Sequence, residues 1–206
     1  MAVNQEIAEM DKNLSHVNMD TNFNTFKLKY NSKFPSSEWA KCGLLHMKKR
    51  KLSTLEEINS IDGNQFNNYG VITGKVNNIV VVDLDFYKQD SPSFMKEFGT
   101  DYLNTFDTYT VKTGSGGLHL YFQYTSKIKA TQCEEHKIDI KSNNGYVVAP
   151  FSKINKDDTI KEYKVERFSP IRPIPEKLES WLLANIYNGK KKKVKKERNP
   201  RVKVEN

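Results

Sequence analysis

The chain has 206 residues, enough for one substantial domain and short for two. Its formal net charge is +8, of which residues 190–206 carry +7 (nine basic against two acidic residues), so that residues 1–189 are nearly neutral. No apolar run is long enough to cross a bilayer and the first twenty residues do not resemble a signal peptide, which excludes a membrane-spanning or secreted protein and predicts a soluble, intracellular one.

The N-terminal third has helix signals and one basic cluster. Residues 1–20 lack periodicity and predict a flexible arm, followed by one domain over residues 21–189. Ser36-Ser37 before residues 38–41, and Ser53-Thr54, indicate two helix starts. Between them lie Lys48, Lys49, Arg50 and Lys51, near Trp39. Basic residues beside an aromatic suit contacts to single-stranded DNA, although such a run also fits a solvated helix or loop face.

The apolar run from Val80 to Val82 ends in two aspartates, Asp83 and Asp85. Residues i and i+2 of a strand point to the same face, so the two carboxylates project together while Leu84 points into the core. Oxygen ligands of this kind suit Mg²⁺ or Mn²⁺. A strand that simply ends in solvated acids is the alternative for this motif alone.

A helix is expected at residues 91–98, and the next chemical feature is a glycine-rich turn over 113–117 between strands at 109–112 and 118–122. Glycines allow backbone N–H groups to approach an anion, so the turn could bind phosphates. Alternation places His119 and Tyr121 on the face opposite Leu118 and Leu120. Taken singly, the turn and the histidine also fit an ordinary hairpin and a surface or core histidine.

The third polar strand spans residues 137–141, where Asp139 lies between Lys137 and Lys141. Asn144-Gly145 is a hairpin signal, so this strand is predicted to pair with the following run at 146–150. Asp139 could add a third carboxylate to the site. An exposed strand of mixed charge is the alternative.

The chain ends in an amphipathic helix and a basic tail. Apolar residues at helical spacing follow Pro175 up to Tyr187 and predict a helix that closes the core. Residues 190–206 have almost no apolar content and predict disorder. Their lysines fit a nuclear import signal, a DNA tether or a linker, so either cytoplasm or nucleus is expected. The isolated Cys42 and Cys133 predict free thiols without a zinc site or disulfide.

Three motifs in this order resemble the archaeo-eukaryotic primase superfamily. The closest similarity is to the bifunctional primase/polymerase (prim-pol) domain of plasmid, phage and large-virus replication proteins. Residues 80–85 resemble motif I, Thr113-Gly114-Ser115-Gly116-Gly117-Leu118-His119-Leu120-Tyr121-Phe122 resembles motif II, and Ile138-Asp139 before Gly145-Tyr146-Val147-Val148-Ala149-Pro150 resembles motif III. The resemblance covers about residues 65–152. The chain departs from the family pattern in two places. Motif II is often S-x-H, whereas here Gly117 stands two residues before His119. The lysine–proline signature that relatives usually carry upstream is missing.

The resemblance implies a role for each motif residue. Asp83, Asp85 and Asp139 would be catalytic residues and ligands of Mg²⁺ or Mn²⁺. His119 would contact the triphosphate of the incoming nucleotide, helped by Ser115, the amides of Gly116 and Gly117, and the cations of Lys112 and Lys141. The partners would be single-stranded DNA template, primer, NTP or dNTP, and a replicative helicase.

The expected fold is α/β (α+β): an antiparallel sheet like that of an RNA-recognition motif carries the three motifs, with a smaller mixed α/β N-terminal unit. The expected function is that of a template-directed DNA primase/polymerase. A metal-dependent nuclease or replication-initiator domain and a non-catalytic DNA-binding relative are the alternatives.

Overall fold

The computed structural model describes residues 23–29, 31–35 and 68–187. The chain divides into two compact units, Met1–Pro173 and Ile174–Asn206. The boundaries predicted at residues 20 and 190 and the helix starts at 36–54 lie at or in segments outside this description, so they stay predictions. The same holds for the basic cluster Lys48, Lys49, Arg50 and Lys51.

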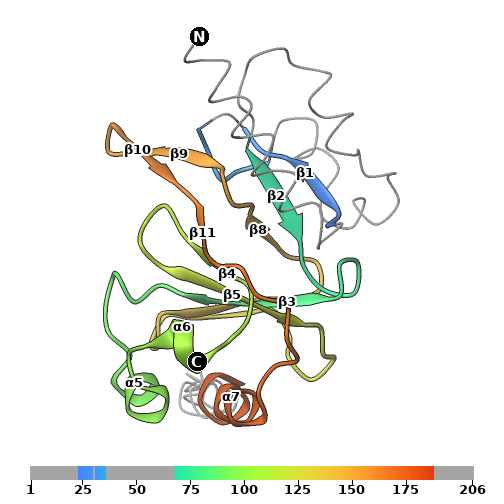
Figure 1. The fold of residues 1–206 in the computed structure, drawn as a ribbon, viewed down its shortest axis with the longest axis vertical. Coiled ribbons are helices and arrows are strands. Elements are labelled where there is room, and N and C mark those ends of the chain that lie inside the picture. The colour runs from blue at the N-terminus through green and yellow to red at the C-terminus, as the bar shows by residue number, and fades with distance from the viewer. Residues whose placement is uncertain (1–22, 30, 36–67, 188–206) are drawn as a thin grey trace, which may run out of the picture. The chain divides into compact units, whose positions relative to one another are not determined.

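The first unit is built on a six-stranded antiparallel sheet with β3 near its centre (Figure 1). Its strands are β3 (Ile79–Leu84), β4 (Thr110–Lys112), β5 (Leu118–Gln123), β6 (Thr131–Cys133), β7 (Ile138–Lys141) and β11 (Lys164–Arg167). They lie in the order β11-β4-β5-β3-β7-β6. The mixed α/β fold with an antiparallel sheet under the three motifs is confirmed, and β4 and β5 form the hairpin expected around the glycine-rich turn.

A second sheet has three strands: β1 (Thr25–Lys27), β2 (Tyr69–Ile72) and β8 (Tyr146–Val148), in the order β1-β2-β8. The prediction that the strand at 137–141 pairs with the next one is therefore wrong. The turn itself forms, with Asn144 at φ 64° and the Gly145 N–H donating to Ser142 O at 3.1 Å. Thr73, at the end of β2, donates its N–H to Gly145 O at 2.9 Å, and this bond continues into the β2–β8 pairing.

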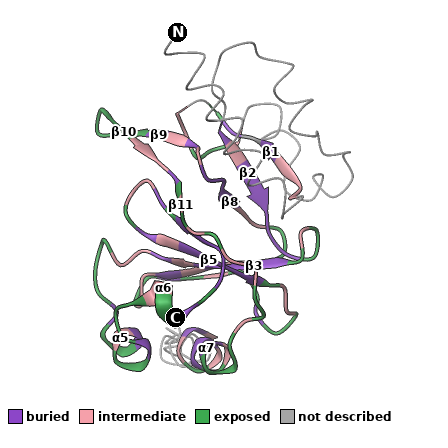
Figure 2. Cartoon of the chain, viewed as in Figure 1, coloured by how far each residue is buried: buried purple, intermediate pink, exposed green. Residues whose placement is uncertain are grey.

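Strand alternation gives the six-stranded sheet two covered faces. Val81, Val111 and Tyr121 point toward the three-stranded sheet and share a buried core with residues such as Phe26 and Val147. Figure 2 shows the resulting burial along β3 and β5. This core lies beside Asp83 and holds the candidate site on a rigid base.

The other face of the sheet is covered by two short helices, α5 (Pro92–Phe98) and α6 (Tyr102–Thr105). α5 begins with Pro92 in its first turn, as the sequence predicts. The buried ring of Phe94 contacts Phe98 and Phe106, and Phe106 contacts Phe122 of β5 edge to face. Aromatic packing thus joins the helices to the sheet.

The hairpin of β9 (Lys153–Lys156) and β10 (Thr159–Glu162) had no counterpart in the sequence predictions. Asp157 and Asp158 connect the strands at φ 53° and 56°, the positive angles that a two-residue hairpin turn of type I′ requires. The alternation of residues along β9 and this Asp-Asp pair were the sequence signals that could have predicted the hairpin.

The described part of the second unit is helical. α7 (Glu176–Leu182) follows Pro175, as predicted, and continues into one π-helical segment, η1 (Leu183–Tyr187). Among the residues described, no helix is long and apolar enough to span a membrane. Cys133 is a buried free thiol, as predicted, whereas Cys42 lies outside the described ranges.

Candidate active site

The three polar strands meet side by side, and their functional residues form one row across the sheet. Asp83 of β3 lies opposite His119 of β5 on one side and opposite Asp139 of β7 on the other. Directly opposed residues of antiparallel strands project from the same face, with Cβ atoms about 4.5–5.5 Å apart. The fold thus brings together two carboxylates and an imidazole from three separate segments.

Asp85 adds a carboxylate at the end of β3. It lies two residues after Asp83 and so continues on the same face, while Leu84 is buried on the other. The Asp85 N–H donates to Lys137 O at 2.9 Å, which extends the β3–β7 pairing past the last residue of β3. This bond fixes the backbone from which the second carboxylate projects.

The glycine-rich turn is closed on itself through Thr113. Gly117 N donates to Thr113 Oγ1 at 2.9 Å, and Gly116 N donates to Thr113 O at 2.9 Å. The N–H groups of Gly116 and Gly117, which were predicted to bind a phosphate, therefore both donate hydrogen bonds within the turn. Neither is free to donate to a phosphate in this conformation. The role of Ser115 stays a prediction.

Gly117 is needed for close packing against the carboxylate strand. A Cβ at this position would lie 2.6 Å from Leu84 O and 3.4 Å from Asp85 Oδ1. At position 117 the turn therefore lies too close to the end of β3 for any side chain, and it lies beside Asp85.

Of the two lysines predicted at the site, only Lys141 reaches the carboxylates. Its Nζ lies 2.9 Å from Asp139 Oδ2, and it stands on the same face of β7 as Asp139. Lys112 follows Val111, which lies opposite His119, so alternation places Lys112 on the opposite face of the sheet. Lys88, which was not among the predicted site residues, makes an ion pair with Asp85.

In the described part of the chain, Asp85 and Asp139 each pair with a lysine, whereas Asp83 has no such ion pair. Burial raises its pKa to about 7, and the nearby charges of Asp85 and Asp139 add to this effect, while Lys141 opposes it. Its Oδ1 is buried without a hydrogen-bond partner in the described part of the chain. Such an oxygen is suited to accept a cation or a proton.

His119 is a buried, neutral imidazole beside Asp83. Burial lowers its pKa to about 3, with a smaller effect from the positive charge of Lys141. Its Nε2 lies 3.7 Å from Asp83 Oδ1, too far for a hydrogen bond, and its Nδ1 has no partner among the residues described. A neutral imidazole can still donate one N–H to an anionic ligand.

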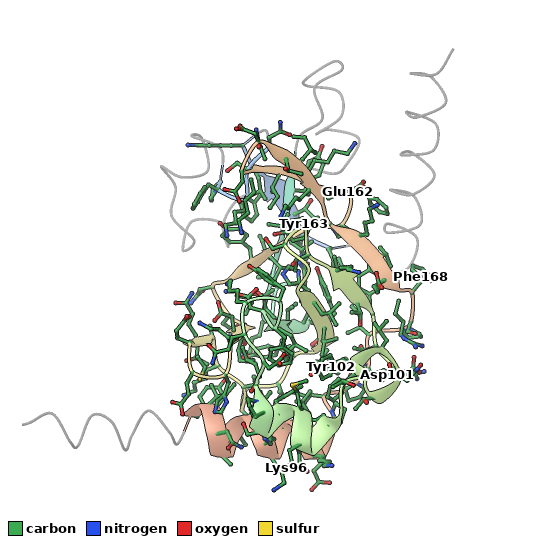
Figure 3. The ribbon with its side chains drawn as sticks, turned by 90° about the vertical axis from the view of Figure 1, so that its left-hand side faces the viewer. Lys96, Asp101, Tyr102, Glu162, Tyr163 and Phe168 are labelled. Atoms are coloured by element: carbon green, nitrogen blue, oxygen red, sulfur yellow. The ribbon has the colours of Figure 1, made fainter. Side chains whose placement is uncertain are left out.

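Tyr163 lies beside His119. The ring of Tyr163 lies 5.8 Å from that of His119, and Figure 3 shows Tyr163 directly after Glu162 at the end of the hairpin. Burial and the charge of Asp83 raise the pKa of Tyr163 well above its ordinary range. Tyr163 was not among the predicted site residues, because no element was predicted between residues 151 and 174.

The donor set fits a divalent cation, although the side chains are not arranged around one. In the described ranges, no three His, Cys, Asp or Glu side chains are placed so as to hold a metal ion. Asp83 nevertheless has an oxygen without a hydrogen-bond partner among the described residues, and two further carboxylates nearby raise its pKa. A hard cation would stabilise the ionised form of this carboxylate. Asp85 and Asp139 would have to turn from Lys88 and Lys141 toward Asp83.

Comparison with known proteins identifies the family. A family model described as "Bifunctional DNA primase/polymerase, N-terminal" (Prim-Pol) matches residues 17–177, more than three quarters of the chain. A comparison with curated proteins gave no match. The matched range contains the whole carboxylate row, the glycine-rich turn and the β9–β10 hairpin.

Proposed function

The chain belongs to the bifunctional DNA primase/polymerase family, and from that premise we propose that it catalyses template-directed nucleotide polymerisation. A primer 3′-hydroxyl attacks the α-phosphate of an NTP or dNTP, a new phosphodiester bond forms, and pyrophosphate leaves. The observation that carries the proposal is the row of Asp139, Asp83 and His119 on three neighbouring strands. It combines acidic ligands with a neutral donor, the combination that a nucleoside triphosphate and its cation need.

Asp83, Asp85 and Asp139 would hold Mg²⁺ or Mn²⁺. When bound there, the cation lowers the pKa of the 3′-hydroxyl and neutralises charge on the reacting phosphates. Lys88 and Lys141 already compensate two of the three carboxylates, which reduces the repulsion that a triphosphate meets on entry. The chain thus contributes mainly position and electrostatics to the reaction.

The polymerase proposal is tested by extension of a primed single-stranded DNA template with labelled dNTPs or NTPs, in Mg²⁺ or Mn²⁺. The wild-type chain should extend the primer, and the Asp83→Ala/Asp85→Ala variant should not. Asp90→Ala, an exposed carboxylate five residues after Asp85, is the matched control and should retain activity. A parallel reaction without primer tests primase activity.

Other outcomes of this assay would favour the alternatives. Strand cleavage that depends on the same carboxylates would favour a nuclease or replication-initiator domain. Binding of DNA without extension or cleavage, with both sugars and both metals, would favour a non-catalytic relative.

His119 is proposed to donate an N–H to the triphosphate. Its replacement by alanine should raise the KM for the nucleotide as well as lower kcat. Loss of one hydrogen bond to a charged group, worth about 1.5–3 kcal/mol, corresponds to about a 10- to 150-fold fall in kcat/KM. His136→Ala is the control, since the Nδ1 of His136 lies within hydrogen-bond distance of the hydroxyl groups of Ser91 and Ser93. Steady-state kinetics with an unchanged nucleotide KM would contradict this role.

A further inference from the structure

An exposed tyrosine stands at the edge of the carboxylate row. Asp85 O accepts the N–H of Lys88 at 3.0 Å, so residues 85–88 form a tight turn directly after β3. Within this turn Phe86 is anchored against Phe94 of α5, with ring centroids 5.5 Å apart. Tyr87 is left 41% exposed, two residues from Asp85. The proposed chemistry does not use this ring.

Two ammonium groups from different segments approach the ring of Tyr87. Lys88 Nζ lies 5.3 Å and Lys156 Nζ 5.9 Å from the ring centroid. Lys156 comes from the end of β9, about seventy residues further along the chain. Both distances are in the range of cation–π contacts. We call Tyr87, Lys88 and Lys156 the basic rim.

The packing of the hairpin explains why Lys156 arrives there. Ile154, Lys156 and Lys161 share one face of the β9–β10 hairpin, according to its register. On this face, a Cβ at Gly114 would lie 3.0 Å from Lys161 Cβ and 3.3 Å from Ile154 Cγ1. The hairpin thus rests on the glycine-rich turn, and Gly116 of the same turn borders Tyr87. Three segments meet at the basic rim.

We infer that the basic rim binds the single-stranded template at the entrance of the active site, with one nucleobase stacked on Tyr87 and the adjoining phosphates bound by Lys88 and Lys156. This inference rests on the proposed function, because the strand is the template of that site. Aromatic rings with nearby cations bind single strands by base stacking and phosphate contact, largely independent of sequence. The cations come from two separate segments, so they can bind phosphates on both sides of one nucleobase. A strand has phosphates on both sides of each base, whereas a mononucleotide has them on one side only.

The inference is tested by strand binding without catalysis. A fluorescently labelled thymidine oligonucleotide of about twenty residues is titrated with the full chain in EDTA, and anisotropy gives the Kd. Base–aromatic stacking is worth about 1–3 kcal/mol, so Tyr87→Ala should weaken binding by about 5- to 150-fold. Tyr87→Phe retains the ring and should stay within about twofold of wild type.

An abasic strand of the same length separates stacking from phosphate binding. The wild-type chain should bind it more weakly than the thymidine strand, and Tyr87→Ala should cause no further loss. Lys156→Ala should reduce the slope of log K against log salt by about 0.7, the value for one phosphate of a single strand. Lys96→Ala removes an exposed charge from α5, at the end of the first unit opposite Tyr163 in Figure 3, and should leave the slope unchanged.

The outcomes distinguish this inference from the proposed function. If Tyr87→Ala and wild type bind the thymidine strand equally while the wild type extends primers, the inference is overturned and the function stands. If Tyr87 governs strand binding but no extension occurs, the inference stands and the proposed polymerase does not. An altered nucleotide KM with unchanged strand affinity would assign the ring to the incoming base and overturn the template assignment.

Discussion

Asp83 and His119 lie beside each other with pKa values shifted in opposite directions. The pKa of Asp83 is raised to about 7, so between about pH 4 and 7 the folded state binds more protons there than the unfolded state. The stabilisation from a neutral Asp83 is therefore lost as pH rises through 7. The pKa of His119 is lowered to about 3, so its contribution is present above about pH 6.5 and is lost as pH falls.

Single substitutions should separate these two pH dependences. Relative to wild type, Asp83→Asn should become progressively more stable as pH rises from 5 to 7, by at most about 1.4 kcal/mol per pH unit. His119→Gln should show the opposite trend, gaining relative stability as pH falls below about 6. Urea unfolding in EDTA at several pH values gives both differences. A pH-independent difference for either variant would contradict the corresponding shift.

At the scale of single elements, the contact between the glycine-rich turn and β3 can be tested through Gly117. Its replacement by alanine would place a Cβ 2.6 Å from the carbonyl oxygen of Leu84, a backbone atom that cannot rotate away. We expect a loss of about 1–3 kcal/mol in the free energy of unfolding, the usual cost of overpacking. Primer extension should also fall, because the clash would displace the backbone of Leu84, which directly precedes Asp85.

Ser115→Ala, in the same turn, is the control for this substitution. It removes a hydroxyl group without adding a carbon atom and should leave the free energy of unfolding within about 0.5 kcal/mol of wild type. Both variants can be compared by urea unfolding. A Gly117→Ala chain as stable as Ser115→Ala would show that the turn can move away from β3.

Local patterns predicted the elements well and their partners less well. An apolar run located β3, alternation located β5 and β7, and together they gave the face that carries Asp83, His119 and Asp139. The Asn144-Gly145 signal correctly marked a turn, but a turn does not decide which strand the chain pairs with next. β8 pairs instead with β2, about seventy residues earlier in the chain, and no local pattern contains that pairing.

Several site residues could not be inferred because they depend on contacts distant in sequence. Lys156 approaches Tyr87 only because its hairpin packs on the glycine-rich turn. Conversely, the turn has the glycine-rich composition of a phosphate-binding loop. The N–H groups of Gly116 and Gly117 nevertheless donate hydrogen bonds within the turn. The glycines of the turn therefore indicated that its backbone packs closely against another group, but they did not show that this group is the end of β3.

At the scale of the whole molecule, charge is concentrated at one end of the sequence. Removal of residues 190–206 would lower the formal net charge from +8 to +1. Non-specific affinity for nucleic acid depends on such charges and decreases with salt. We therefore expect a chain ending at residue 189 to bind single- and double-stranded DNA more weakly at low salt, with a smaller salt slope, and to approach wild type at high salt.

The tail and the basic rim should therefore contribute differently to DNA binding. Truncation at residue 189 should leave kcat unchanged when DNA is saturating, because the carboxylate row and the rim lie between residues 83 and 156. Replacing the six lysines at 190–193, 195 and 196 by glutamine lowers the net charge to +2 at full length, and it should reproduce the truncation. Loss of Tyr87, by contrast, should weaken binding of a thymidine strand at every salt concentration. If the truncated chain bound DNA as well as wild type at all salt concentrations, the tail would have no part in binding.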